Sequence, residues 1–342
     1  MNARRLRASL RGWGGVGAMA LACATALVLA LLLPNSAHGD GVTGAGGQGL
    51  ARGTQARAAE CTDPQNLSPA PSGADGPTIE AIKNRSDRRL IVGVDQNSYH
   101  WGYRDPNNPE AGSNLEGFDI DLVHAIAKDI LGDPDAVQFR AIPTSQRIPA
   151  IQKGKVDMVV RTMTINCDRL KQVAFSAPYF KTGQQVLAPA RSSVTGYDKS
   201  LADKRICSAS GSTAYERLTA DRKAGRLASG AKVSPPVPNQ LDCLVRLQLG
   251  EADAVVTDGA LAASQAAQDP TVALKGGTFT TEFYGVAMKK GSDDDLVRRV
   301  NRILADYVKD GWRKSYDKWL APTLGPDSPS EDPPVAQYKQ TT

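Results

Sequence analysis

Histidine is scarce in this chain of 342 residues, which has three, His38, His100 and His124, in separate regions. The five cysteines show no C-x-x-C spacing. Zinc sites need clustered histidines or closely spaced cysteines, and acid–base catalysis needs a titrating pair within reach of the substrate. We find neither pattern, and we therefore expect no metal, no other cofactor and no enzymatic activity.

The chain also lacks a stripe of basic residues with interleaved aromatics, although its net charge is +5. Several of its basic residues precede an apolar N-terminal segment, in "RRLR". Binding of nucleic acid requires basic residues gathered on one face of a folded domain. A nucleic-acid partner is therefore not expected.

The N-terminus has the pattern of an export signal over residues 1–39. Four arginines precede an apolar run at 13–33, and Pro34 and the small residues of "SAHG" follow it. This order is typical of a secretory signal, but the run is long enough to span a bilayer as an uncleaved anchor. Lipidation at Cys23 is a third option, although most of the apolar residues follow that cysteine. We expect an extracytoplasmic protein, either held at the membrane or secreted.

Four cysteines remain beyond the apolar run: Cys61, Cys167, Cys207 and Cys243. An even number in an exported chain favours disulfides, and four cysteines allow three connectivities. Proximity along the chain favours Cys207–Cys243 in one domain and Cys61–Cys167 in the other. The alternative is four free buried thiols.

Composition divides the chain into a folded body and two irregular segments. Residues 40–77 are rich in Gly, Ala, Ser and Pro, which predicts a flexible linker, and residues 323–342 predict a disordered tail. Between them, short apolar strands alternate with amphipathic helices, which indicates an α/β fold with mainly parallel sheets in two units. Ligands of such sheets bind beyond the carboxyl ends of strands, where Asp95, Arg161–Thr162 and Asp258 lie.

The segment "GFDIDLVHAIAKDI" at 117–130 predicts an amphipathic helix with a continuous apolar stripe. Asp119 and Asp121 lie in its first turn, where carboxylates interact favourably with the helix dipole and accept from free N–H groups. We therefore interpret these acids as residues that start the helix.

Five blocks in order carry a resemblance to a known family: "LEGFDIDLVHAIAKDI", "IPAIQKGKVDMVVRTMTINCDRLKQVAFSAPYF", "SGSTAYERL", "LGEADAVVTD" and "YGVAMKKG". With the C-terminal helices, residues 88–322 resemble the extracellular solute-binding proteins of family 3, in their glutamate- and glutamine-type branch. The resemblance implies a two-lobed protein, with lobe 1 at 78–186 and 286–322 and lobe 2 at 187–285. It further implies a monomer that closes by a hinge, near 185–188 and 281–285, and delivers an amino acid to an ABC permease.

The resemblance also implies a ligand site. Arg169 matches the arginine that clamps the α-carboxylate, a role that suits a bidentate guanidinium. Asp258 matches the acid that pairs with the α-ammonium, although it could instead cap the next helix. The remaining implied contacts come from Thr162 and Thr164 and from the helix-start turn Gly211, Ser212 and Thr213.

Two arginines and one acid bear on the choice of ligand. Arg147 matches an arginine that binds the distal carboxylate of acidic amino acids, and Arg161 can face the ligand's side chain. Asp95 opposes them: it could pair with an arginine, or accept from the amide of glutamine or asparagine. Tyr99 and Trp101 are either walls of the pocket or loop anchors. We expect the ligand to be glutamate. The alternatives are a protein that binds glutamine or asparagine, and an amino-acid sensor ectodomain that signals to a membrane partner.

Overall fold

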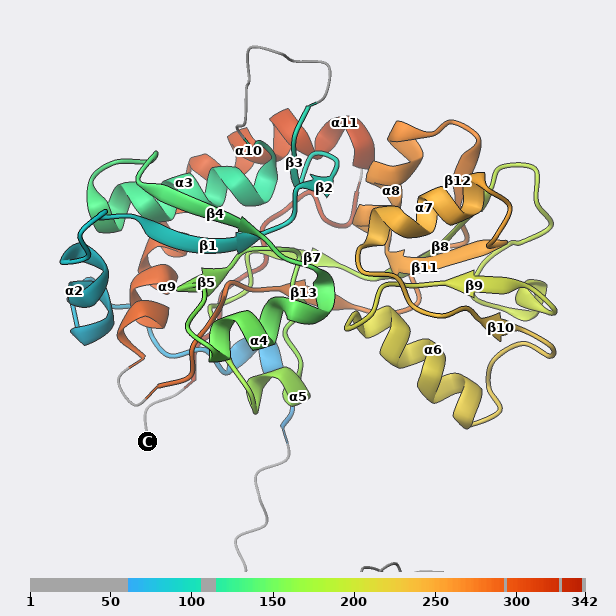
Figure 1. Ribbon diagram of the computed structural model, residues 1–342, viewed down its shortest axis with the longest axis horizontal. Helices are drawn as coiled ribbons and strands as arrows, with labels where there is room; N and C mark the ends of the chain where they lie inside the picture. The colour runs from blue at the N-terminus through green and yellow to red at the C-terminus, as the bar shows by residue number, and fades with distance from the viewer. Residues whose placement is uncertain (1–60, 106–114, 292–293, 326–327, 340–342) are drawn as a thin grey trace, which may run out of the picture. The chain divides into compact units, whose positions relative to one another are not determined.

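The computed structural model describes residues 61–105, 115–291, 294–325 and 328–339 (Figure 1). The predicted signal segment, Cys23 and residues 40–60 of the predicted linker lie outside the described residues. Among the described residues no helix is both long enough and apolar enough to cross a membrane.

The first five-stranded sheet has the order β4-β1-β5-β14-β6, in which the first three strands are parallel and β14 runs antiparallel to both of its neighbours. Its strands are β1 (Leu90–Val94), β4 (Val137–Ala141), β5 (Met158–Val159), β6 (Ala174–Phe175) and β14 (Ala287–Met288). We call this sheet and the helices on it lobe 1.

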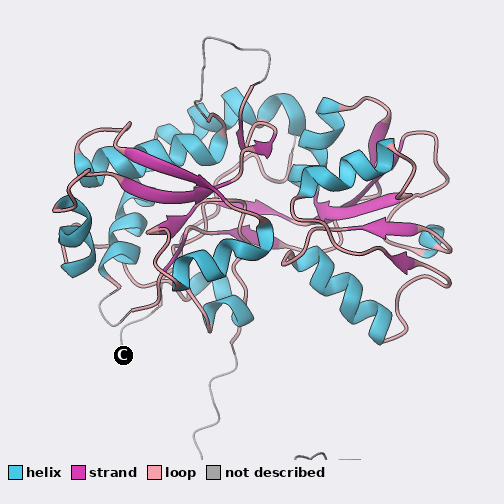
Figure 2. Cartoon of the chain, viewed as in Figure 1, coloured by secondary structure: helices cyan, strands magenta, loops and turns pink. Residues whose placement is uncertain are grey.

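The second sheet repeats this pattern with the order β10-β9-β11-β8-β12, again three parallel strands and then an antiparallel one (Figure 2). Its strands are β8 (Gln184–Pro189), β9 (Arg205–Cys207), β10 (Lys232–Val233), β11 (Ala254–Asp258) and β12 (Val272–Lys275). This sheet and its helices form lobe 2. Two lobes of mixed α/β structure confirm the predicted fold class.

The chain passes between the two sheets twice, and the two passages pair with each other. They are β7 (Phe180–Thr182) and β13 (Glu282–Tyr284), which form an antiparallel ladder. The second predicted hinge segment, 281–285, contains β13. The first, 185–188, is wrong, because those residues lie inside β8, where each pairs with β11, with β12 or with both.

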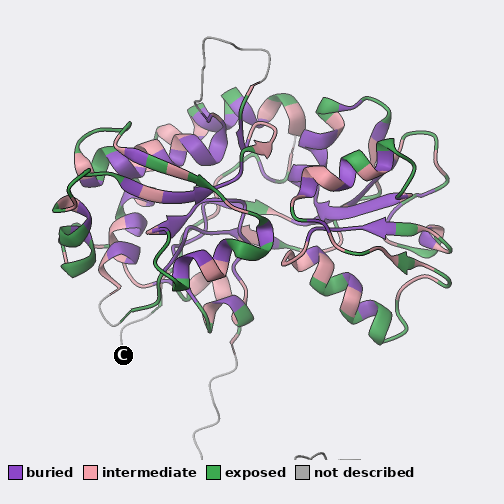
Figure 3. Ribbon diagram, in the orientation of Figure 1, coloured by how far each residue is buried: buried purple, intermediate pink, exposed green. Residues whose placement is uncertain are grey.

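Helices cover the sheets, and the strands and the inner faces of the helices are buried (Figure 3). Most of the buried side chains are apolar. Lobe 1 carries α2 (Pro77–Lys83), α3 (Phe118–Leu131), α4 (Arg147–Gln152), α5 (Cys167–Leu170), α9 (Asp295–Tyr307), α10 (Gly311–Trp319) and α11 (Ala321–Leu324). Lobe 2 carries α6 (Thr213–Lys223), α7 (Gln240–Gln248) and α8 (Gly259–Gln268). The short pieces are β2 (Asn97–Ser98), β3 (Gly102–Tyr103) and 3₁₀ turns at Pro64–Asn66, Thr144–Gln146 and Lys199–Leu201.

The two acids at the start of α3 do not cap it, contrary to the interpretation of the sequence. The residue before the helix is Gly117, and no side-chain cap is present. Asp121 accepts from Ser315 Oγ at 2.7 Å and Trp319 Nε1 at 2.8 Å, and so ties α3 to α10. Asp119 is buried and points toward the ligand site described below.

Residues 61–77 and the tail pack against lobe 1, so the expectations of a flexible linker and a disordered tail do not hold for the described parts of these segments. Ser68 Oγ donates to Phe175 O at 2.9 Å and accepts from Asn301 Nδ2 at 2.7 Å. Lys339 N donates to Ser68 O at 2.8 Å. Composition alone missed these contacts because each uses a single polar group in a Pro- and Ser-rich stretch.

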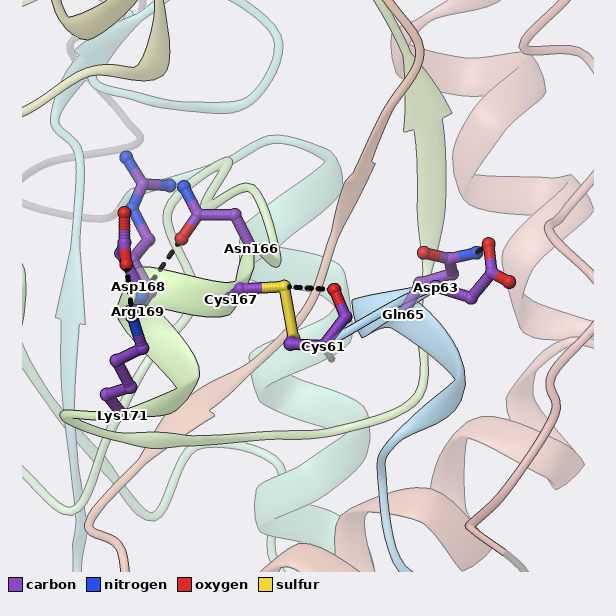
Figure 4. The surroundings of a disulfide bond; sticks show 8 residues. All are labelled: Cys61, Asp63, Gln65, Asn166, Cys167, Asp168, Arg169 and Lys171. Carbon is purple, nitrogen blue, oxygen red and sulfur yellow. Dashed lines mark hydrogen bonds and ion pairs between the residues drawn. A yellow bond between two sulfur atoms is a disulfide. The ribbon is translucent and has the colours of Figure 1, made fainter. Parts of the chain in front are cut away.

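Both predicted disulfides are confirmed. Cys207 and Cys243 join β9 to α7 with 5.6 Å between their Cα atoms. Cys61 and Cys167 join the N-terminal arm to α5, with 5.9 Å between Cα atoms (Figure 4). The Asn166 side chain caps α5 by accepting from Arg169 N at 2.9 Å, so this disulfide anchors the short helix that carries a predicted ligand residue.

Candidate ligand-binding site

The predicted ligand residues converge where the strands of the two lobes end. Asp95 follows β1, Arg161 and Thr162 follow β5, and Asp258 ends β11. The charged and hydroxyl side chains that lobe 1 contributes, together with Asp258, are each at most 7% exposed: Asp95, Arg147, Arg161, Thr162, Thr164, Arg169 and Asp258. Gly211, Ser212 and Thr213 are half-buried at the start of α6 in lobe 2.

Two guanidinium groups of lobe 1 reach the same carbonyl of lobe 2. Arg147 Nη2 and Arg169 Nη2 each donate to Gly211 O at 3.1 Å. Their other bonds also go to carbonyls: Arg169 to Thr164 O at 2.7 Å, and Arg147 to Thr144 O, Arg161 O and Thr162 O. Among the described residues neither arginine forms an ion pair. Burial lowers the pKa of both groups because it disfavours their charged forms. An anion placed between them would stabilise the charged forms.

Gly211 is required at that point of contact. Its φ is +75°, a conformation that L-residues rarely adopt, and a Cβ there would lie 2.8 Å from the Cα of Ser145 in lobe 1. Ser212 is the N-cap of α6, with its hydroxyl accepting from Tyr215 N at 3.1 Å. Thr213 is the first residue of the helix, where backbone N–H groups have no partner within the helix.

Arg161 and Asp95 neutralise each other. Arg161 is fully buried and its Nη2 lies 2.7 Å from Asp95 Oδ2. Arg161 also donates to Thr144 Oγ1 at 2.9 Å and to Asn239 Oδ1 of lobe 2 at 3.0 Å. Asp95 further accepts from two backbone N–H groups and from Ser98 Oγ. Of the alternatives for Asp95, pairing with Arg161 is the one that the structure shows.

Asp258 does not cap α8 with its side chain. Its carboxylate instead accepts from the Tyr284 hydroxyl of β13. Burial, and then the neighbouring charge of Glu282, raise the pKa of Asp258 to about 8. A carboxylate in this position would return to its ionised form when a cation binds beside it.

Three further residues belong to the site although the sequence did not point to them: Glu282, Asp119 and Tyr284. Glu282 is 6% exposed, and its carboxylate accepts from the hydroxyls of Thr164 and Thr213. No motif distinguishes it in the stretch "TTEFYG". The available signal was its place within the predicted hinge segment 281–285.

Asp119 holds the strand-end turn that carries Thr162. Its Oδ2 accepts from Thr162 N at 3.0 Å and its Oδ1 accepts from the Tyr179 hydroxyl at 2.8 Å. Thr162 has a φ of +39°, which is strained for a β-branched residue and needs such support. Burial raises the pKa of Asp119 to about 7.

The two aromatic candidates behave as loop anchors. Trp101 is fully buried, packs edge-on against Phe118 and Phe180, and donates from Nε1 to Ser264 Oγ of lobe 2 at 3.2 Å. Tyr99 stacks on His100. Within the described ranges no group of His, Cys, Asp and Glu side chains could hold a metal ion.

Residues 90–322 match the bacterial extracellular solute-binding proteins, family 3. The chain belongs to this family. Family 3 membership confirms the expectation of a binding protein rather than an enzyme, working outside the cytoplasm.

Relatives of this family 3 protein have different ligands in their names. The ABC transporter glutamine-binding protein of Bacillus subtilis is 33% identical over 244 residues, which is 71% of this chain and 84% of the relative. The glutamate-binding protein of Corynebacterium efficiens is 29% identical over 272 residues, 75% of this chain and 84% of the relative. A solved receptor for L-cysteine from Neisseria gonorrhoeae has a TM-score of 0.64 at 28% identity, covering 72% of this chain and 95% of the receptor.

Proposed function

We propose that this protein captures glutamate in the closed cleft between its lobes and delivers it to an ABC permease. The observation that carries the choice is the Arg161–Asp95 ion pair. Because Asp95 is occupied by Arg161, it does not oppose an acidic ligand, and Arg147 has no acidic partner among the described residues.

Each end of the ligand has a matching group. Arg169 takes the α-carboxylate, with Thr162, the backbone of Thr164 and the N–H groups at the start of α6. Asp258 takes the α-ammonium, and Arg147 takes the distal carboxylate. Charged donors that are already buried and directed by carbonyls bind a carboxylate with little loss of side-chain entropy.

The closed arrangement is supported by contacts between the lobes that need no ligand. Thr144 N donates to Pro238 O at 3.1 Å and Thr144 Oγ1 donates to Gln240 Oε1 at 3.1 Å. Arg161 bonds Asn239, and Arg147 and Arg169 bond Gly211, all across the same interface. Opening would separate these groups and expose the cleft while β7 and β13 remain paired.

Glutamine is the second candidate ligand, because the Bacillus subtilis relative is a glutamine-binding protein and Glu282 places another negative charge in the cleft. We also propose that the protein acts as a monomer. The N-terminal segment would hold it at the cell membrane or be removed. A sensor role would use the same cleft with a different membrane partner.

The test compares Arg147→Met and Arg147→Lys by calorimetric titration with glutamate and glutamine. Arg147→Met should weaken glutamate at least tenfold more than glutamine, since a buried charged hydrogen bond is worth roughly 1.5–3 kcal/mol. Arg147→Lys keeps the charge and should recover part of that difference. Equal losses for the two ligands would exclude Arg147 as the residue that reads the distal carboxylate, and the preference for glutamate would then fall.

A further inference from the structure

Glu282 lies in a strand that links the two lobes, and its carboxylate contacts residues of both lobes. It is the first residue of β13, one of the two strands that link the lobes, and it pairs with Thr182 of β7. Its Oε2 accepts from Thr164 Oγ1 of lobe 1 at 2.5 Å and from Thr213 Oγ1 of lobe 2 at 2.9 Å. Its Oε1 accepts from Gln184 Nε2. One carboxylate therefore joins both lobes at the binding site.

These bonds change what the two threonines can offer a ligand. A hydroxyl has one proton to donate and two lone pairs that accept. Because Thr164 and Thr213 give their protons to Glu282, they present only acceptor oxygens to the cleft. Such oxygens suit an ammonium group or an amide N–H and do not suit a carboxylate.

The charges of the cleft lead to the same conclusion. Arg161 and Asp95 cancel, which leaves Arg147 and Arg169 facing Asp258 and Glu282. The Glu282 charge acts on both Arg169 and Asp258. When the ligand's ammonium binds beside Asp258 and ionises it, these four charges cancel. A zwitterion with an uncharged side chain keeps this balance, whereas a second ligand carboxylate adds one unbalanced negative charge to a buried site.

We propose that Glu282 is a specificity-determining residue, whose carboxylate disfavours a charged side chain on the ligand and so limits the preference of the cleft for glutamate over glutamine. The inference rests on the proposed capture of glutamate or glutamine. It assigns opposite effects to two residues of one site: Arg147 favours the distal carboxylate, and Glu282 opposes it.

The structure offers a conservative way to remove the charge. Gln184 Oε1 is buried and has no hydrogen-bond partner within the described part of the chain. It lies beside the Nε2 that donates to Glu282. In Glu282→Gln, the new amide can turn its oxygen toward the two threonines and its nitrogen toward Gln184. Gln184 can then flip its own amide so that its unpaired oxygen accepts, and the packing is kept.

The experiment measures the affinities of glutamate and glutamine for the wild-type protein and three variants by calorimetric titration. Glu282→Gln should raise the ratio of glutamate to glutamine affinity by about tenfold, the size expected for removal of a like charge within one buried site. Glu282→Asp, which keeps the charge, should leave the ratio near the wild-type value. Glu216→Gln removes an acid on α6 whose charge also acts on Arg169 but which has no bond to Thr164 or Thr213, and it should raise the ratio less than Glu282→Gln does.

The outcomes separate the two proposals. Wild-type protein that binds neither amino acid overturns the proposed function, and the inference with it. Wild-type protein that binds, together with a Glu282→Gln ratio that is unchanged or lowered, overturns the inference alone. An equal rise in Glu216→Gln would show a general field effect and also overturn it. A Glu282→Gln protein that does not fold would show that Glu282 acts as scaffold, contrary to the inference.

Discussion

Replacing Asp95 by Asn tests the ion pair on which the choice of ligand depends. Asp95 Oδ1 accepts from the backbone N–H groups of Gln96 and Asn97, and Asn can keep both bonds. Asp95 Oδ2 accepts from Ser98 Oγ and pairs with Arg161. Those two interactions are lost, because the substitution places an amide N–H₂ there.

The cost follows from the burial of Arg161. Removing one member of a buried ion pair costs about 3–5 kcal/mol, since it leaves an uncompensated charge. We expect the free energy of unfolding to fall by about 3 kcal/mol, at the low end of that range, because the turn keeps its backbone bonds and Arg161 keeps Thr144 and Asn239. The unpaired Arg161 should also favour glutamate over glutamine more than in the wild type.

Urea denaturation and calorimetric titration measure these two effects. The double variant Asp95→Asn/Arg161→Met is the control, and it should recover part of the lost stability because no lone charge remains buried. The reasoning would be refuted if Asp95→Asn stayed within about 1 kcal/mol of wild-type stability, a range typical of exposed ion pairs, and selectively lost its affinity for glutamine. That result would mean that Asp95 faces the ligand's amide.

Three further predictions concern the rest of the site and its scaffold. Arg169→Ala should abolish amino-acid binding with unchanged circular dichroism, and retained affinity would remove Arg169 from the site. Burial and the charge of Glu282 raise the pKa of Asp258 to about 8, and this pKa should fall when the ligand's ammonium binds beside the carboxylate. Ligand affinity should therefore rise between pH 6 and 8 with release of a proton. Calorimetry in two buffers of different ionisation enthalpy measures this release, and its absence would contradict the pairing of Asp258 with the ammonium. The Cys207→Ser/Cys243→Ser variant should lose about 3–4 kcal/mol, as a chain-entropy model gives for a loop of this length, and a loss below 1 kcal/mol in urea denaturation would show that this disulfide does not stabilise lobe 2.

Much of the fold could be predicted because its local patterns of apolar residues match the elements that become buried. The apolar runs at 90–94 and 254–258 are buried strands, and the stripe at 117–130 is a helix. The acids of that helix were misread, because the favourable helix dipole explains a carboxylate there without revealing that Asp119 reaches Thr162 and that Asp121 reaches α10.

The site residues at the ends of strands could be predicted from the sequence. The prediction missed Glu282, which lies in a strand that links the lobes. Asp258 and Arg161 follow apolar strands, so their place at a sheet edge follows from the α/β pattern. Glu282 begins a strand of three residues that pairs with β7, about 100 positions earlier in the chain. A pairing so distant leaves no periodic signal, and the hydroxyls that Glu282 accepts from come from different lobes.

Calorimetric titration of the wild-type protein with glutamate, aspartate, glutamine and asparagine tests the central claim most directly. The account predicts one molecule bound per chain, with glutamate bound most tightly and glutamine next. Tighter binding of an amide amino acid would contradict the role given to Arg147, and binding of none of the four would contradict the proposed function.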